Sequence, residues 1–231
     1  MRALTPEILD FLAPDDPRAQ RSRRDLARIN WVMHQSAIMA RALARCPQPR
    51  LMADLGGGDG RFMFSVARRL AKHWPGVRLV ILDRQNIVSE ETRAGFAALG
   101  WQCDTMQGDI FESLPRIAPD IVTANLFLHH LDDAHLQRLL GLVAARSRSF
   151  IACEPRRSAF ALLGARLVFA LGANDVTRHD AVASVRAGFR DLELSMLWPK
   201  DRAWICQESG AWPFSQVFCA QARSGGQKNA L

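Results

Sequence analysis

The sequence lacks the cysteine pattern of a disulfide-stabilised or zinc-binding protein. Its five cysteines are odd in number and scattered along the chain, and none belongs to a C-x-x-C pair. Neither a disulfide framework nor a zinc site follows from such an arrangement. Because free thiols persist in a reducing compartment, the expected location is cytoplasmic.

Long apolar runs and a signal peptide are also missing. The closest candidate for a membrane span, residues 160–173, is interrupted by Arg166 and falls short of the roughly 18 residues that a span needs. The first 17 residues are acidic and broken by prolines, unlike a signal peptide. We therefore expect neither a membrane span nor secretion.

Positive charge is in excess but is not concentrated. The 30 lysines and arginines outnumber the 23 acidic residues, for a net charge of +7. The basic residues are dispersed, with the exception of an arginine cluster in residues 18–28. Dispersion is typical of a solvated surface and disfavours a nucleic-acid partner.

The length and composition predict one globular domain. A chain of 231 residues, 48% of them hydrophobic, can bury a sizeable core. About fifty residues precede the first strand that the pattern indicates, which is too few for a second domain. We expect a helical cap over residues 1–49, the core of the same domain over residues 50–223, and a disordered tail over residues 224–231.

A glycine-rich turn is the most informative segment. The apolar residues 51–55 precede glycines at positions 56, 57, 58 and 60, and the residues from 61 onward have helical periodicity. This is the strand, turn and helix that open a parallel α/β sheet. Glycine allows a ligand to approach the backbone closely, and the N–H groups at the start of the helix face the same place.

Two common ligands of such turns are disfavoured by the residues present. The dinucleotide fingerprint G-x-G-x-x-G would need its third glycine at Arg61, and the G-K-[ST] ending of a P-loop is absent. The pattern D-x-G-x-G-x-G, which begins at Asp54, resembles the first motif of the class I S-adenosylmethionine-dependent methyltransferases. That cofactor carries an ammonium and a sulfonium, so a carboxylate beside the turn suits it.

Two further acidic residues follow the next strands. Asp83 ends the second predicted strand, where a carboxylate can bind the hydroxyls of a ribose; its alternative role is to cap the following helix. Asp109 ends the third strand, where it could accept from an adenine amine or serve simply as a turn residue. Three acids at three consecutive strand ends favour a shared ligand over coincidence.

The fourth and fifth strands extend the resemblance over residues 51–155. The N-x-x-L-H-H pattern from Asn125 and the Glu154-Pro155 ending are similar to the branch that methylates small molecules, including quinone and polyketide-type substrates. The [DN]-P-P-[YF] motif of enzymes that methylate base amino groups is absent. The resemblance implies a Rossmann-like, doubly wound sheet of seven strands, mostly parallel with an antiparallel last strand.

The resemblance also implies the ligands. The cofactor is S-adenosyl-L-methionine, the partner is a small-molecule acceptor, and a homodimer is a possible assembly. The cofactor-binding residues expected at the glycine turn and the strand ends are Asp54, Gly56, Gly57, Gly58, Asp83, Arg84, Asp109, Ile110 and Asn125.

The remaining elements are predicted from periodicity alone. We expect helices over residues 4–12 and 21–46, a helix over residues 160–173, a helix over residues 181–189, a sixth strand over residues 192–197 and a seventh over residues 213–222. The helix at 160–173 is interpreted as a core helix, or alternatively as a wall of an apolar acceptor pocket. The polar residues 174–180 are expected to form a loop at the acceptor site.

Histidines are the candidate bases, because a phenolic acceptor must lose its proton. In order of preference they are His130, His129 and His179, with His34 as a further candidate. The residues expected to line the acceptor pocket are Trp31, His34, Arg178 and Asp180. No group of residues has the spacing of metal ligands, so no metal site is expected.

The sequence therefore predicts a methyltransferase that acts on a small aromatic or lipid-like acceptor, most readily on oxygen. Two alternatives stay open at this point. One is methylation of carbon in a quinone precursor, which needs the same cofactor site. The other is a non-catalytic, RNA-associated protein with the same fold, suggested by the positive charge and the arginine cluster.

Overall fold

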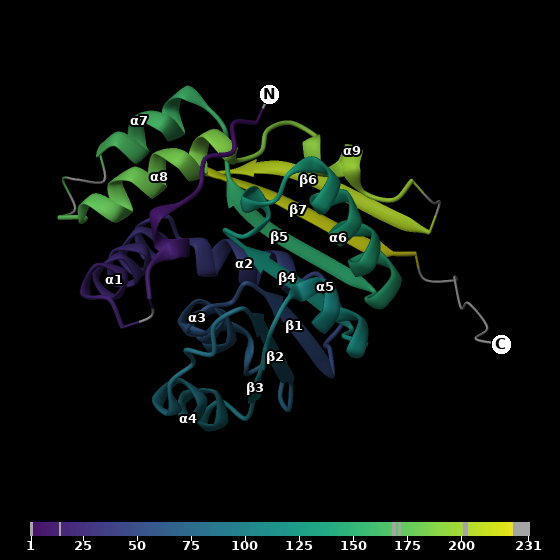
Figure 1. Cartoon of the computed structure of the whole chain (residues 1–231). Coiled ribbons are helices and arrows are strands. Elements are labelled where there is room, and N and C mark those ends of the chain that lie inside the picture. Colours follow the sequence, from purple (N-terminus) through teal and green to yellow (C-terminus); the bar gives the residue numbers. More distant parts are fainter. Residues whose placement is uncertain (1, 14, 168–169, 171, 201–202, 224–231) are drawn as a thin grey trace.

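The computed structural model of the chain describes residues 2–13, 15–167, 170, 172–200 and 203–223. The tail that we expected over residues 224–231 lies outside the described residues. Seven strands form one sheet (Figure 1): β1 Leu51–Leu55, β2 Arg78–Asp83, β3 Gln102–Gln107, β4 Ile121–Asn125, β5 Ser149–Pro155, β6 Trp204–Ala211 and β7 Ser215–Ala222.

The strand order is β3-β2-β1-β4-β5-β7-β6. The first five strands are parallel, and β7 pairs antiparallel with both β5 and β6. This confirms the predicted doubly wound class with an antiparallel last strand. The order reverses between β1 and β4, and in open α/β sheets ligands bind at the carboxyl ends of the strands around such a reversal.

Helices cover both faces of the sheet. Their bounds are η1 Ile8–Phe11, α1 Pro17–Val32, α2 Gln35–Leu43, α3 Arg61–Leu70, α4 Glu90–Ala98, α5 Ile110–Ser113, η2 Leu114–Arg116, η3 Leu128–His130, α6 Asp133–Arg146, α7 Ala159–Leu167, α8 Asp175–Ala187 and α9 Glu193–Leu197. No helix among the described residues is long and apolar enough to cross a bilayer.

Strand alternation divides the core into two layers. Met52 and Leu79 point to the face covered by α2, α3 and α4, whereas the next residues along each strand, Ala53 and Val80, point to the face covered by α5, α6 and α9. Nearly all these strand residues are buried. Burial on both faces is what a central parallel sheet requires, and it explains the almost continuous apolar runs of β1 and β2.

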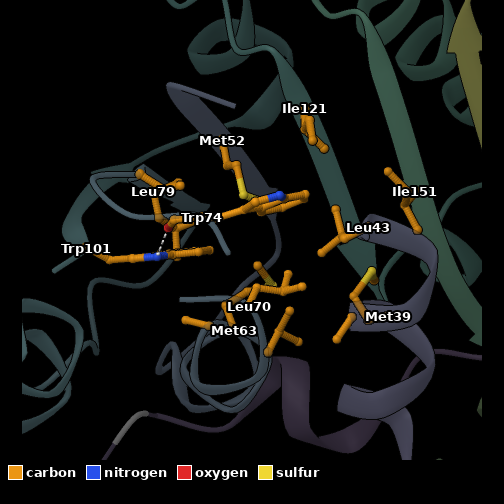
Figure 2. Close-up of a cluster of buried hydrophobic side chains, with 14 of the residues drawn as sticks. Met39, Leu43, Met52, Met63, Leu70, Trp74, Leu79, Trp101, Ile121 and Ile151 are labelled. Carbon is orange, nitrogen blue, oxygen red and sulfur yellow. Dashed lines mark hydrogen bonds between the residues drawn. The ribbon is translucent and has the colours of Figure 1, made fainter. Parts of the chain in front are cut away.

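Figure 2 shows the first of these layers. Met39 and Leu43 of α2 and Met63 of α3 come together with side chains of the sheet. At the edge of this layer, the indole N–H of Trp101 donates to the carbonyl oxygen of Trp74 at 2.8 Å. The N-terminal helix α2 is therefore part of the main core and holds the preceding residues against it.

The N-terminal helices differ from our expectation. The single helix predicted over residues 21–46 is two helices, because His34 adopts a left-handed backbone conformation (φ 53°) between α1 and α2. Polar His34 and the flanking apolar residues keep helical periodicity, so the pattern could not reveal the break. The helix predicted over residues 4–12 is the short 3-10 turn η1.

The apolar segment after β5 is not a core helix. In α7 the side chains of Phe160, Leu163 and Leu167 are half or more exposed, and only the small residues Ala161 and Ala165 are buried. Because nearly every position in this segment is apolar, its sequence carries no sign of which face is buried. The prediction of a buried helix is wrong for the described residues of this segment.

Two further expectations in the last third are wrong. The polar residues 174–180 are not a loop: Asn174 caps α8 by accepting the N–H of Thr177 at 2.9 Å, and α8 continues to Ala187. The sixth strand is not at residues 192–197, which form α9, but at Trp204–Ala211. β6 is an edge strand with many exposed residues, so it lacks the apolar alternation that would identify it.

Candidate active site

The glycine turn between β1 and α3 has backbone conformations that favour glycine. Gly56, Gly58 and Gly60 have φ angles of 65°, 56° and 76°, a region in which other residues are strained. A Cβ at Gly56 would overlap the ring of Phe127, whereas a Cβ at Gly58 would meet nothing within 4 Å. The turn is thus covered by Phe127 at Gly56 and open at Gly58.

Asp83, at the end of β2, connects the glycine turn to the loop after β2. One carboxylate oxygen accepts the N–H of Gly58 at 2.9 Å, and the other accepts the N–H of Gln85 at 2.8 Å. The following helix has its own cap, since Ser89 accepts the N–H of Thr92 at 3.2 Å. The alternative role of Asp83 as a cap is therefore wrong, and its carboxylate lies against the turn.

Asp54 lies beneath the turn and not in an open crevice. It is 2% exposed, and one carboxylate oxygen accepts the hydroxyl of Thr123 at 2.7 Å. A Cβ at Gly57 would come within 2.5 Å of the other oxygen. Burial raises the pKa of Asp54 to about 7, with the hydrogen bond from Thr123 opposing the shift and the charge of Asp83 adding to it.

Asp109 follows β3 and has the simpler of the two roles considered for it, that of a residue in the turn after the strand. Asp109 caps α5 by accepting the N–H of Phe111 at 2.7 Å, and the next residue, Ile110, is buried. Arg84 is exposed, and its carbonyl oxygen accepts from the side chain of Gln107 at 3.2 Å. The roles of Asp109, Ile110 and Arg84 in binding a cofactor stay predictions.

Asn125 is the last residue of β4 and has an unpaired buried atom. Its Oδ1 is buried and has no hydrogen-bond partner among the described residues. The preceding residue, Ala124, pairs in register with Leu55, the residue before the glycine turn. An unpaired buried acceptor costs about 1–3 kcal/mol. A donor bound beside the turn would remove that cost.

The histidine pair in η3 lies under the N-terminal segment. His129 is buried between two carboxylates, with its Nδ1 2.7 Å from Glu154 Oε2 and its Nε2 3.2 Å from Glu7 Oε1. Glu7 also accepts the hydroxyl of Ser184. Burial lowers the pKa of His129, but the hydrogen bonds and charges of Glu154 and Glu7 outweigh it and raise the pKa to about 9.

His130 is the more accessible member of the pair. Its side chain is 26% exposed, and its Nδ1 lies 3.2 Å from Asp10 Oδ2. It borders a cavity of about 330 Å³, whose lining also includes residues of the N-terminal segment: Leu4, Thr5, Pro6, Asp10 and Phe11. His130, the histidine we ranked first, is therefore the one that reaches a cavity. Its role as a base is not tested by this placement.

Glu7 and Glu154 are the residues of this cluster that sequence reasoning did not include. The position of Glu154 could have indicated it, because it lies at the end of β5, and β5 pairs with β4, the strand that leads to the histidine pair. Its Oε1 also accepts the N–H groups of Phe127 and Leu128 at 3.0 and 2.9 Å. Glu7 had no such signal, because it lies 122 residues before His129 and no periodicity connects the two.

The residues predicted to line the acceptor pocket lie on α1, between α1 and α2, and on α8. Asp180 is buried and accepts the N–H groups of Ile8 and Leu9 at 2.8 and 3.0 Å, so it holds the N-terminal segment to α8. His179 pairs with Asp180 at 2.9 Å. Arg178 lies on the same helix α8, Trp31 is 78% exposed on α1, and His34 lies between α1 and α2. Their acceptor roles stay predictions.

A second cavity, of about 400 Å³, lies between α1 and the exit of the glycine turn. Its lining is mostly polar and consists of Gln20, Arg23, Arg24, Asp59, Arg61, Ile87, Ser89 and Thr92. Two members of the arginine cluster noted in the sequence therefore face the side of the molecule that carries the turn.

Comparison with known proteins decides the family. A family model described as the O-methyltransferase domain matches residues 8–149, which is more than half of the chain. The chain belongs to this family. The match spans the glycine turn, Asp83, Asp109 and the histidine pair, and it confirms the resemblance drawn from their pattern.

Two individual relatives are longer than this chain, which matches only part of each. Strychnine O-methyltransferase of Strychnos nux-vomica is 28% identical over 89 residues, which are 38% of this chain and 22% of that protein. The structure of mitomycin 7-O-methyltransferase is 22% identical, with a TM-score of 0.56, and covers 90% of this chain and 59% of its own. This chain thus spans less than two thirds of both.

A third relative is closer in length. The plantazolicin methyltransferase, solved with SAH and a desmethylplantazolicin analogue, is 12% identical with a TM-score of 0.65, and the match covers 90% of this chain and 91% of that one. At these identities the solved structures establish the fold, which is that of a class I methyltransferase in this family.

Proposed function

We propose that this chain transfers a methyl group from S-adenosyl-L-methionine to an oxygen atom of a small aromatic or lipid-like acceptor. The observation that carries the proposal is the match of residues 8–149 to the O-methyltransferase domain. It is supported by the names of two relatives, strychnine O-methyltransferase and mitomycin 7-O-methyltransferase, both of which act on oxygen of small molecules.

The residues around the glycine turn fit the cofactor. Gly58 leaves open space above the turn, and Asn125 Oδ1 lacks a donor that an ammonium group would provide. Asp83 is half-buried and its carboxylate can accept from ribose hydroxyls beyond the two N–H groups it already accepts. When bound, the cofactor supplies a methyl group on a sulfonium, and its positive charge would favour ionised Asp54.

The protein's part in such a transfer is to orient the reactants and to exclude water. Holding an acceptor oxygen in line with the methyl group can contribute about 7–11 kcal/mol of the barrier reduction. The N-terminal segment is held to α8 by Asp180 and to η3 by Glu7, and these contacts support a role for it in covering the acceptor.

His130 is our candidate for the base. It borders the cavity of about 330 Å³, whereas the Nε2 of His129 is occupied by Glu7. His130 would accept the proton of an acceptor hydroxyl, and Asp10, beside its Nδ1, would stabilise the imidazolium. A positioned base of this kind contributes about 10²–10⁴-fold. The roles of His129 and His179 as bases are secondary candidates.

The decisive test combines cofactor binding with product analysis. Calorimetry should detect binding of S-adenosylmethionine by the wild-type protein, and Asp83→Ala should abolish it. Asp104→Ala, which removes a partly exposed carboxylate of β3 that pairs with Arg78 of β2, is the matched control and should bind normally. Unchanged binding by the Asp83 variant would place the cofactor elsewhere.

The acceptor is then identified with methyl-labelled cofactor and panels of phenols, quinols and fatty-chain aromatics. Fragmentation of the product distinguishes an O-methyl from a C-methyl group, and a C-methyl product would favour the quinone-precursor alternative. Steeply salt-dependent RNA binding without methyl transfer would favour the RNA-associated alternative.

A further inference from the structure

Three side chains from distant parts of the sequence converge beneath the N-terminal segment. Glu7, which immediately precedes η1, and the neighbouring His129 and His130 of η3 each place a ligand-type atom within 4.8 Å of the others. The His129 Nε2 is 3.2 Å from Glu7 Oε1, and the His130 Nε2 is 4.0 Å from Glu7 Oε2. The two nitrogens therefore face the two oxygens of one carboxylate.

Both histidines are oriented in the same way. The Nδ1 of His129 lies 2.7 Å from Glu154 Oε2, and the Nδ1 of His130 lies 3.2 Å from Asp10 Oδ2. A carboxylate on one ring nitrogen orients the ring so that the other nitrogen can bind a metal, and metal-binding histidines are almost always held like this. In His129 that other nitrogen, Nε2, is hydrogen-bonded to Glu7, so an ion bound there displaces the proton between the two side chains. The cluster thus has both the ligands and the orienting groups of a metal site.

The spacing fits a small divalent ion. Bonds of about 2.0–2.2 Å in tetrahedral geometry separate neighbouring ligand atoms by about 3.3–3.6 Å. The observed 3.2 and 4.0 Å lie on either side of this range, and all three ligand atoms lie within 4.8 Å of one another, so side-chain adjustments of about an ångström would bring them to it. His130 also borders the cavity of about 330 Å³, which gives a fourth ligand, such as water, access to the site.

The charges around the cluster favour a cation. Three carboxylates, those of Glu7, Glu154 and Asp10, surround the two imidazoles. The nearby guanidinium of Arg2 does not neutralise them: it donates to the carbonyl oxygens of His129 and Leu131 and to Asp133.

We propose that Glu7, His129 and His130 form a binding site for a divalent transition-metal ion, with Zn²⁺ as the preferred ion. Two imidazoles and one carboxylate are ligands that Zn²⁺ accepts, and three protein ligands leave a fourth position open. The ion ties the N-terminal segment, through Glu7, to the histidine pair at the end of β4. Asp10 and Glu154 act as positioning residues for the two rings.

Metal binding at this site does not require methyl transfer, but both proposals involve His130. An ion on the His130 Nε2 occupies the lone pair that would accept the acceptor's proton. If the proposed function also holds, Zn²⁺ inhibits methyl transfer. Binding itself needs no cofactor or acceptor, so its failure is separable from failure of the proposed function.

The test is titration of the tag-free full chain with ZnCl₂ by calorimetry, and with CoCl₂ by visible absorption. We expect one Zn²⁺ per chain. Glu7→Gln and His130→Ala should each weaken binding by at least about 10-fold, and Asp10→Asn, which disturbs only the ring orientation, by about 10-fold. Thermal melts should show a rise in Tm with Zn²⁺ for the wild type that Glu7→Gln loses.

Matched controls separate this site from incidental binding. His135 pairs with Asp132 at 2.8 Å on the surface and belongs to no group of three potential metal ligands among the described residues, so His135→Ala should bind Zn²⁺ like the wild type. Cys206 is an exposed thiol, and Cys206→Ser should also leave binding unchanged. Absence of Zn²⁺ binding, equal affinity in Glu7→Gln and the wild type, or a thiolate charge-transfer band with Co²⁺ would overturn the proposal.

Discussion

The glycine turn and the histidine cluster lie at the same edge of the sheet but are built in different ways. The turn is assembled from neighbours in the chain: Gly56 and Gly58 follow β1 directly, and Asp83 comes from the adjacent strand. The cluster of Glu7, His129 and His130 joins the N-terminal segment to η3 across more than a hundred residues. The turn can therefore form with the sheet, whereas the cluster exists only after the N-terminal segment has docked.

The same difference governs how each region tolerates charge. Asp54 is buried under the turn without a cation, so its pKa rises. His129 is buried between two carboxylates, so its charged form is favoured. The first region thus has a carboxylate whose ionised form a positive ligand would stabilise. In the second region the carboxylates hold a proton on His129, which the proposed metal ion would displace. Four predictions test this contrast, from the largest expected effect to the smallest.

Glu154→Ala should be the most destabilising change. It removes a fully buried carboxylate that binds His129 and accepts the N–H groups of Phe127 and Leu128. Breaking a buried charge pair costs about 3–5 kcal/mol, measurable by urea denaturation. Asp133→Ala, which removes an exposed carboxylate that pairs with Arg2, should cost less than about 1 kcal/mol. Equal losses of unfolding free energy in the two variants would show that the buried cluster stabilises the protein no more than the pair of Asp133 with Arg2 does.

Asp54→Asn should change how stability depends on pH. In the folded protein the pKa of Asp54 is about 7, above its ordinary 3.8, so ionisation favours the unfolded chain. The wild-type free energy of unfolding should therefore fall, relative to the variant, as pH rises from about 4 to 7, by up to ~4 kcal/mol. Denaturation curves of the cofactor-free proteins at several pH values measure it. Parallel pH profiles would contradict the assignment.

Gly56→Ala and Gly58→Ala should separate steric overlap from backbone strain. Both positions have positive φ, which costs a non-glycine residue about 1–2 kcal/mol. Only at Gly56 would the added methyl also overlap Phe127. Such overpacking costs a further ~1–3 kcal/mol. We expect a larger loss of Tm for Gly56→Ala. A greater effect at Gly58 would mean that Phe127 moves aside at little cost.

Asp180→Ala should loosen the N-terminal segment without unfolding the core. It leaves the N–H groups of Ile8 and Leu9 without their acceptor, at a cost of about 1–2 kcal/mol. Hydrogen exchange should increase at residues 7–12 and stay unchanged in β1 and β2. Uniformly faster exchange would show that the segment and the core open together.

Prediction from sequence succeeded for elements whose pattern is contained in one short segment of the chain. The five parallel strands and the helix after the glycine turn were visible in local patterns. Prediction failed where apolar and polar residues do not alternate with a regular period, so that the sequence does not show which face is buried. In α7 almost every residue is apolar, so exposure of Phe160 and Leu163 could not be foreseen. The edge strand β6 has no apolar alternation, and residues 192–197 took its place in the prediction.

The sequence by itself determined the family, the parallel sheet and the glycine turn, because each depends on residues close enough in the chain for their spacing to be meaningful. Only the tertiary structure decided that Asp54 lies beneath the turn, that Asp180 holds the N-terminal segment and that Glu7 meets the histidine pair. Those contacts join segments separated by many tens of residues or depend on burial, and neither property leaves a periodic trace in the chain.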